Sequence, residues 1–311
     1  MADDDVSSTS FETFALFDDD IAVVISAEIA DLEERVEQSQ AHLWYDGSWS
    51  TTDLPQSCIA VRTWEHDQLM HVYYLSNDGI VLHDDGESDI EAEPIDETDD
   101  GPNEMVMMRD MRRKDNVLVA VGMARMAYEK VLPDGKWHRI DQGLYVPPDQ
   151  ITTSVGLNGL AFDNHGGILA VGYKGEIWYR DQGGVWASQA SPTNVLLSAV
   201  AAHPEADELT IVGLQGLVLQ GSPRTGWTVV QGAPQIDFWS VTYFKGQVYL
   251  GSDSGVFRLK NGVFEDVKVG GKKSVTTSFL ESTAGAIWSM GDSHLFKSTN
   301  GTQWTALPSP V

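Results

Sequence analysis

Short apolar segments that end in glycine recur along the chain at nearly constant spacing. From residue 117 onward there are five, and their closing glycines lie 50, 41, 38 and 40 residues apart. Apolar runs of this length, bounded by turn residues, are typical of buried strands, because buried helices need longer periodic segments. The five segments span residues 117–122, 168–172, 209–213, 248–251 and 287–291.

Each of these segments opens the same longer pattern. A second strand follows, then a glycine turn, then an aromatic residue that lies 15, 14, 14, 13 and 13 residues after its glycine. The aromatic residues are Trp137, Trp186, Trp227, Phe264 and Trp304. Because the register is this regular, the pattern predicts a structural repeat of about four short strands per unit.

The repeat predicts an all-β fold, a single β-propeller domain over residues 1–311 with blades of four antiparallel strands. Sheets of four strands stacked around an axis bury both of their faces, and units of 38–50 residues match the period of a propeller blade. Seven blades fit best, although six or eight stay open because the first two units are degenerate. The expected unit starts lie near Thr13, Cys58, Met105, Leu157, Leu196, Phe238 and Val275.

Two details of the first unit complete this expectation. Residues 28–40 are the one helix candidate, with Ile29, Leu32 and Val36 on one side, so we expect a short acidic helix or loop insertion in the first blade. Residues 1–10 are expected to form a flexible N-terminus. Segment 11–17 is expected either to begin the first blade or to complete the last one.

The segment 298–304 carries a more specific pattern. Ser298, Asn300, Gly301 and Trp304 resemble the Asp-box, the Ser-x-Asp-Gly-x-x-Trp turn of sialidase-like (BNR-type) and photosystem-assembly-factor-like propellers, with Asn in place of the usual Asp. The turns 46–49 and 134–137 are shortened relatives. In those families the box is a structural turn, so the resemblance implies a fold and not an activity.

The formal charge is concentrated in the first third of the chain. Residues 1–105 contain 28 acidic residues and two basic ones, Arg35 and Arg62, whereas the rest of the chain contains 18 of each. The entire formal net charge of −26 therefore comes from residues 1–105. Such asymmetry indicates either an interaction surface or a device for solubility.

Composition excludes several classes of protein. The acidic balance disfavours nucleic-acid binding, since phosphate would be repelled, and no apolar run is long enough to span a membrane. A single cysteine, Cys58, excludes an internal disulfide and fits a reducing, cytoplasmic location. Neither the aspartate runs nor the histidines show the spacing of a metal site, so no metal and no cofactor are expected.

Blade topology converts the charge into a predicted partner-binding surface. In a four-stranded blade, the connections between the second and third strands and between successive blades emerge on one face of the ring. We therefore expect the insertion of the first unit, the acid-rich segment 88–103 of the second, and the connection 141–154 of the third to share that face. The candidate residues are Glu28, Asp31, Glu33, Glu34, Glu37, Asp89, Glu91, Glu93, Asp96, Glu97, Asp99, Asp100 and Tyr145.

The first basic cluster is expected elsewhere. Arg109, Arg112, Arg113 and Lys114 lie in one short stretch that reads as a hairpin turn on the opposite face. A sialidase-like glycosidase would instead need arginines dispersed around the central channel, with a tyrosine nucleophile and acidic partners. We therefore expect no catalytic residues.

These features favour a non-enzymatic protein that binds a basic partner through its acidic face. Acidic proteins without a catalytic constellation resemble immunity proteins of bacterial toxin systems, and the resemblance implies a toxin or effector domain as partner, for example a nuclease whose active site is occluded. A scaffold or assembly factor for a multiprotein complex is the alternative, and a glycosidase or glycan-binding propeller is disfavoured. The protein is expected to be a monomer on its own.

Overall fold

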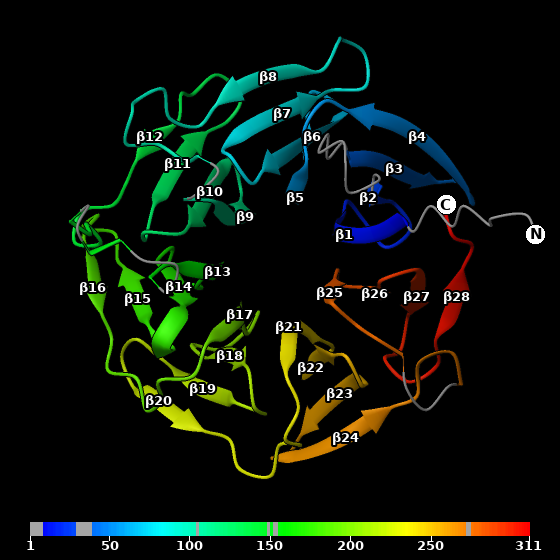
Figure 1. The fold of residues 1–311 in the computed structure, drawn as a ribbon. Helices are drawn as coiled ribbons and strands as arrows, with labels where there is room; N and C mark the ends of the chain where they lie inside the picture. The colour runs from blue at the N-terminus through cyan, green and yellow to red at the C-terminus, as the bar shows by residue number, and fades with distance from the viewer. Residues whose placement is uncertain (1–8, 29–38, 104–105, 148–149, 152–154, 272–274) are drawn as a thin grey trace, which may run out of the picture.

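A computed structural model describes residues 9–28, 39–103, 106–147, 150–151, 155–271 and 275–311. These residues form seven four-stranded antiparallel sheets, each a meander of four consecutive strands. Figure 1 looks along the axis of the ring, with the first strand of each sheet innermost and the fourth outermost. The fold is therefore a seven-bladed β-propeller, which confirms the predicted fold class and blade number.

The blades follow one another along the chain. Blades 1 to 3 consist of β1 (Thr9–Leu16), β2 (Ala22–Glu28), β3 (Ser39–Tyr45), β4 (Ser48–Leu54), β5 (Cys58–His66), β6 (Leu69–Ser76), β7 (Ile80–Asp84), β8 (Glu91–Pro94), β9 (Met108–Lys114), β10 (Val117–Gly122), β11 (Ala127–Val131) and β12 (His138–Arg139). Blades 4 and 5 consist of β13 (Leu157–Phe162), β14 (Ile168–Gly172), β15 (Ile177–Arg180), β16 (Trp186–Ser188), β17 (Leu197–Ala202), β18 (Leu209–Gly213), β19 (Val218–Ser222) and β20 (Gly226–Val229). Blades 6 and 7 consist of β21 (Phe238–Phe244), β22 (Gln247–Ser252), β23 (Gly255–Lys260), β24 (Val263–Val267), β25 (Phe279–Ser282), β26 (Ile287–Gly291), β27 (His294–Ser298) and β28 (Thr305–Leu307).

The described helical segments are two single 3₁₀ turns, Tyr173–Gly175 and Val269–Gly271. The expected helix or loop insertion is shorter than 28–40, because Glu28 ends β2 and Ser39 and Gln40 belong to β3. Residues 29–38, the rest of that prediction, lie outside the described residues. Among the described residues, no helix has the length and apolar character needed to cross a membrane.

The ring closes without exchanging strands between its ends. Segment 11–17 begins the first blade, since β1 pairs with β2 along nearly its whole length. Blade 1 then meets blade 7 through the hydrogen bond from the Phe11 N–H to the Asp292 carbonyl, at 3.0 Å, and through Asp19, which accepts from the Gly285 N–H at 3.1 Å. The blades that hold the first and the last described strands, β1 and β28, are therefore neighbours in the ring (Figure 1).

The hydrophobic core is divided into seven clusters, one at each contact between neighbouring blades. The cluster that joins blades 1 and 7 contains Phe14, Val24, Trp288 and Met290, all at most 2% exposed. Because side chains alternate between the two faces of a strand, each middle strand supplies both of its neighbours. The cores therefore hold the blades together as a ring, and most of the burial lies between sheets.

The repeated glycine has a steric cause. In blades 4 and 5 the glycine that ends the second strand pairs with the first residue of the blade, just before a β-bulge in the innermost strand. A Cβ at Gly172 would lie 2.0 Å from the Gly156 carbonyl oxygen, and one at Gly213 would lie 2.3 Å from that of Leu196. The backbones approach so closely that no side chain fits there.

The turn after β27 is closed by the residues that resemble an Asp-box. The Ser298 hydroxyl accepts the Gly301 N–H at 2.8 Å, and the Asn300 Oδ1 accepts the N–H groups of Thr302 and Gln303 at 2.9 and 2.8 Å. The amide oxygen of Asn300 thus performs the accepting role that an aspartate has in an Asx-turn. Trp304 then packs on the core between blades 6 and 7.

Candidate functional site: an acidic cleft and a basic channel

The two faces of the ring differ in the connections that they carry. We call the face with the connections between successive blades the linker face, exemplified by 95–107 and 140–156. The other, the hairpin face, carries the turns between first and second strands, such as 115–116. Because each blade is a simple meander, every connection can be placed on one face or the other.

The acids predicted in blade 2 are spread over both faces. Asp89 lies between β7 and β8 and therefore on the hairpin face, whereas Glu91 and Glu93 lie on the outermost strand β8. The linker face carries the remaining four, Asp96, Glu97, Asp99 and Asp100. The expectation that segment 88–103 presents all of its acids on one face is wrong, because the last strand of the blade crosses from one face to the other.

Two of these acids are held by the protein itself. Asp96 accepts hydrogen bonds from the Thr98 N–H at 2.9 Å and from the Tyr128 hydroxyl at 2.8 Å. Burial alone would raise the pKa of Asp96, but these bonds and the nearby Arg139 guanidinium leave it below its ordinary value. Glu93 is paired with the buried Lys130 and accepts the Trp137 indole N–H at 3.2 Å.

Asp99, Asp100 and Tyr145 come together around one cleft on the linker face. The cleft has a volume of about 250 Å³ and lies between the connection from blade 2 to blade 3 and that from blade 3 to blade 4. Both aspartates are exposed, and Tyr145 is 67% exposed between the buried Leu144 and Val146. The two buried neighbours anchor the loop and leave the tyrosine ring in solvent.

The cleft combines an apolar floor with an acidic rim. Its apolar side chains come from the turn between β10 and β11 and from both connections, and they are Val106, Ala124, Met126, Val146 and Ile151. Its charged residues are Asp99, Asp100, Asp141 and Arg139, a formal charge of −2. The Arg139 guanidinium is engaged by Asp141 at 2.7 Å and by the Asp100 carbonyl at 3.3 Å. The cleft therefore suits a basic side chain, whose aliphatic stem packs on apolar atoms while its charge meets carboxylates.

The sequence did not single out Asp141 and Ile151 as site residues. The connection 141–154 was predicted to lie on this face. Asp141 was not chosen because it lies outside the acid-rich first third of the chain. The four acids predicted in the insertion of blade 1, Asp31, Glu33, Glu34 and Glu37, lie outside the described residues. Glu28 ends β2.

The basic cluster lies in a strand and not in a turn. Residues 109–114 belong to β9, the innermost strand of blade 3, so the predicted hairpin turn on the opposite face is wrong. Periodicity concealed this strand, because its sequence, MRDMRRK, contains only two apolar residues. Arg109 and Arg112, together with Arg62 of β5, line a cavity of about 90 Å³ on the axis, to which all seven innermost strands contribute.

A buried ion-pair network forms part of this channel. Asp110 is 7% exposed, and one of its carboxylate oxygens lies 3.4 Å from a terminal nitrogen of Arg62. The other accepts from Arg112 Nε at 3.1 Å and from the Leu160 N–H at 3.0 Å. Burial, and then the like charge of Arg112, lower the pKa of Arg62 to about 10, against the opposing effects of Glu281 and Asp110.

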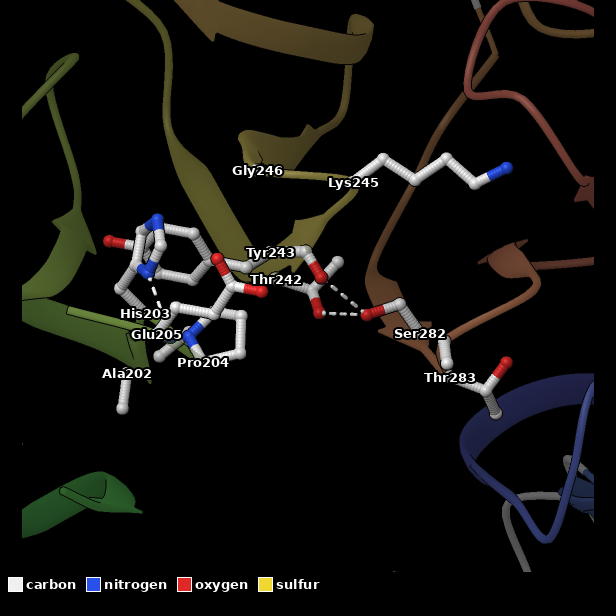
Figure 2. A pocket seen from close by; sticks show the side chains of 12 residues that line it. Ala202, His203, Pro204, Glu205, Thr242, Tyr243, Lys245, Gly246, Ser282 and Thr283 are labelled. Atoms are coloured by element: carbon white, nitrogen blue, oxygen red, sulfur yellow. Dashed lines mark hydrogen bonds between the residues drawn. The ribbon is translucent and has the colours of Figure 1, made fainter. Parts of the chain in front are cut away.

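Another cavity, about 800 Å³, is an open groove on the hairpin face of blades 5 to 7. Figure 2 shows its polar groups bonded to one another: the Thr242 and Ser282 hydroxyls lie 2.9 Å apart, and His203 Nδ1 accepts the Glu205 N–H at 3.0 Å. The Ser282 hydroxyl also donates to the Tyr243 carbonyl at 2.7 Å. Because these groups already have partners, the groove offers little to orient a ligand.

A row of stacked rings lies on blade 2. His71 Nδ1 and His83 Nε2 are 2.9 Å apart, and the His83 ring stacks on Tyr73 with centroids 4.6 Å apart. His66 and His71 lie on the neighbouring strands β5 and β6, with ring centroids 5.8 Å apart. Within the part of the chain that the structure describes, no three histidine, cysteine or acidic side chains are grouped to hold a metal ion.

The fold and this pair of surfaces define the chain as a seven-bladed β-propeller that carries an acidic cleft and a basic channel. No protein-family model matches the sequence. A curated protein that it resembles is the immune protein Tsi7 of Pseudomonas aeruginosa, 29% identical over 292 residues, which are 93% of this chain and 94% of Tsi7. The expected resemblance to an immunity protein is thereby confirmed.

Solved structures show the same fold at low sequence identity. The complex described as YCF48 bound to D1 peptide matches with a TM-score of 0.67 and 13% identity, over 92% of this chain and 90% of that one. The extracellular domain of the putative one-component system BT4673 of B. thetaiotaomicron matches with a TM-score of 0.64 and 15% identity, and covers 97% of this chain. This chain spans only 39% of that larger protein. The expected likeness to propellers of the photosystem-assembly-factor kind is confirmed at the level of fold.

Proposed function

We propose that this chain is an immunity protein, which binds a cognate toxin and neutralises it without catalysing a reaction. The observation that carries the proposal is the similarity to immune protein Tsi7, which extends over 93% of this chain and leaves no separate domain unaccounted for. A similarity of that extent covers nearly the whole propeller and not one shared blade.

The acidic cleft on the linker face is the surface that we assign to the toxin. Asp99, Asp100 and Asp141 surround an apolar floor beside the exposed Tyr145, and exposed aromatic residues are enriched in protein interfaces. Opposite charges on two partners accelerate their encounter by 10- to 1000-fold. A basic toxin domain, such as a nuclease that grips phosphate, is the partner that this surface fits, and its active site would be covered by the docked propeller.

The experiment starts from capture of the partner at low salt, with the full chain as bait and mass spectrometry as readout. The captured protein is then expressed in cells with and without this chain. We expect it to arrest growth alone and to be harmless when both are present. A captured protein that is harmless by itself would contradict the immunity role.

Charge reversal then tests the assigned surface. In the double variant Asp99→Lys/Asp100→Lys the association rate is expected to fall about tenfold at low salt, with a weaker dependence on ionic strength. The matched control is Glu205→Lys/Asp266→Lys, which changes the charge equally at exposed positions on the hairpin face and on the outermost strand of blade 6. Equal association rates for the two variants would exclude the cleft and leave the immunity role standing.

A further inference from the structure

The central channel is a basic site within an acidic protein. Its charged lining consists of Arg62, Arg109, Arg112, Asp110 and Glu281, a formal charge of +1, whereas the chain as a whole carries −26. The two carboxylates therefore leave one positive charge uncompensated. The channel cavity is separate from the acidic cleft, and the two share no lining residue.

Several hydrogen-bond donors in the channel have no partner among the described residues. Arg109 is exposed and, among the described residues, has no hydrogen bond and no ion pair. Arg112 donates only its Nε to Asp110. The hydroxyls of Ser198 and Ser240, both in the lining, are buried and have no partner among the described residues, and Ser240 is only 7% exposed. Buried polar groups are otherwise nearly always satisfied in folded proteins.

The volume of the cavity limits the size of any group that could accept hydrogen bonds from these donors. At about 90 Å³ it holds a few waters or one small group such as a carboxylate. The uncompensated charge matches one negative charge, and planar guanidinium groups match the two oxygens of a carboxylate. Trp239, 38% exposed and held by the Asp253 carboxylate at 2.7 Å, stands in the same lining. Its indole ring supplies an apolar wall.

We propose that the central channel binds one carboxylate group, with Arg109 and Arg112 as its main contacts. Most of the lining residues, including Asn158 and Ser198, belong to the first half of their innermost strands, so the cavity lies toward the linker face. The carboxylate is therefore supplied either by a small free anion or by an acidic side chain of a protein that docks on that face. The site does not depend on the proposed function, and its test needs no toxin.

The test is thermal denaturation of the full chain in increasing formate, with chloride replaced so that ionic strength stays constant. A ligand that binds only the folded state raises the melting temperature in proportion to ln(1 + [L]/Kd). We expect formate to raise it saturably and Arg109→Gln to weaken the apparent Kd at least tenfold. Arg109 is exposed, so this variant keeps the buried network. Arg224→Gln, which removes a 61% exposed arginine on blade 5, is the control and should behave as the unmodified protein.

A second ligand distinguishes the two sources. Glutamate blocked as its N-acetyl, C-amide derivative presents only a side-chain carboxylate. Binding at least as tight as that of formate indicates a side chain from a partner, whereas binding of formate alone indicates a free anion. The proposal is overturned if neither compound shifts the melting temperature beyond chloride, or if Arg109→Gln and Arg224→Gln respond identically.

Discussion

Blades 1 and 2 share their architecture with blades 4 and 5 but differ at one structural position. In blades 4 and 5 the second-strand residue that faces the bulge is glycine, Gly172 or Gly213, whereas blades 1 and 2 have Ser26 and Ser76 there. The two serines are fully buried, and their hydroxyls bond to His42 at 2.8 Å and to the Ile80 N–H at 2.8 Å. This position is thus closed by close backbone contact in blades 4 and 5 and by side-chain hydrogen bonds in blades 1 and 2.

The comparison explains why the repeat is visible in only part of the sequence. In blades 4 and 5 the backbones contact each other so closely that glycine is required, and the recurring glycine makes the repeat visible in the sequence. In blades 1 and 2 a serine takes this place, the glycine is absent and the unit looks degenerate, although the four strands and the core are present. The charge follows the same division, since residues 1–105, which contain blades 1 and 2, account for the entire formal net charge of −26.

The largest effect is expected when serine replaces the bulge-facing glycine of blade 4. Gly172→Ser would place a Cβ 2.0 Å from the Gly156 carbonyl oxygen. The neighbouring atoms belong to the backbone, so they cannot move aside without disturbing the sheet. We expect a loss of about 2–4 kcal/mol in the free energy of unfolding, measured by urea denaturation. The reciprocal change, Ser76→Gly, should cost about 1–2 kcal/mol through the lost hydrogen bond and added backbone freedom.

The cost of Gly172→Ser tests the steric explanation. If its free energy of unfolding lies within about 0.5 kcal/mol of that of the unmodified protein, the range usual for surface substitutions, then the close contact does not require glycine. The repeated glycines would then need another cause.

A smaller effect separates structural acids from surface acids within blade 2. Asp96→Ala removes the acceptor of Thr98 and of the Tyr128 hydroxyl, so we expect a loss of about 1–3 kcal/mol. Asp99→Ala is the matched control, because Asp99 is exposed, and its unfolding free energy should change by less than about 0.5 kcal/mol. Equal unfolding free energies for the two variants would mean that Asp96 does not stabilise the fold. Asp96 would then again be a candidate for the docking surface.

The fold could be predicted from the sequence because the blade is a local pattern. Short apolar runs, glycine turns and aromatic residues lie within one unit of about 40 residues, so the propeller and the order of its units could be predicted. Seven blades fitted best, and six or eight stayed open because the first two units are degenerate. Ring closure could not be predicted. From its sequence, segment 11–17 could begin blade 1 or complete blade 7, the blade to which Asp292 and Trp288 belong.

The site was predictable only in part, for two physical reasons. Asp99, Asp100 and Tyr145 meet because loops on one face converge, which topology foretells. The channel arginines were missed because a strand at the axis needs no apolar alternation: in β9, Arg109 and Arg112 point toward the channel and Asp110 neutralises part of their charge. Hydropathy alone reads such a strand as a turn.

The smallest effect concerns pH and is expected to come from blades 1 and 2. Burial lowers the pKa of both His42 and His83, and for His83 the neighbouring His71 and Lys130 act in the same sense, opposed by Asp85 and Glu91. The unfolded chain therefore takes up these protons first as pH falls below about 6.5. Stability should decline below that pH and level off once the folded protein is protonated as well.

The variant His83→Gln isolates one of the two contributions. Glutamine can still bond to His71 Nδ1 but does not titrate, so the drop in melting temperature between pH 7.5 and pH 5.5 should be smaller than in the unmodified protein. His138→Gln, at an exposed position of blade 3, is the control and should retain the full drop. If both variants lose stability equally on acidification, His83 does not carry the effect, and His42, whose two ring nitrogens are held by Ser26 and Thr51, becomes the remaining buried histidine with the same direction of shift.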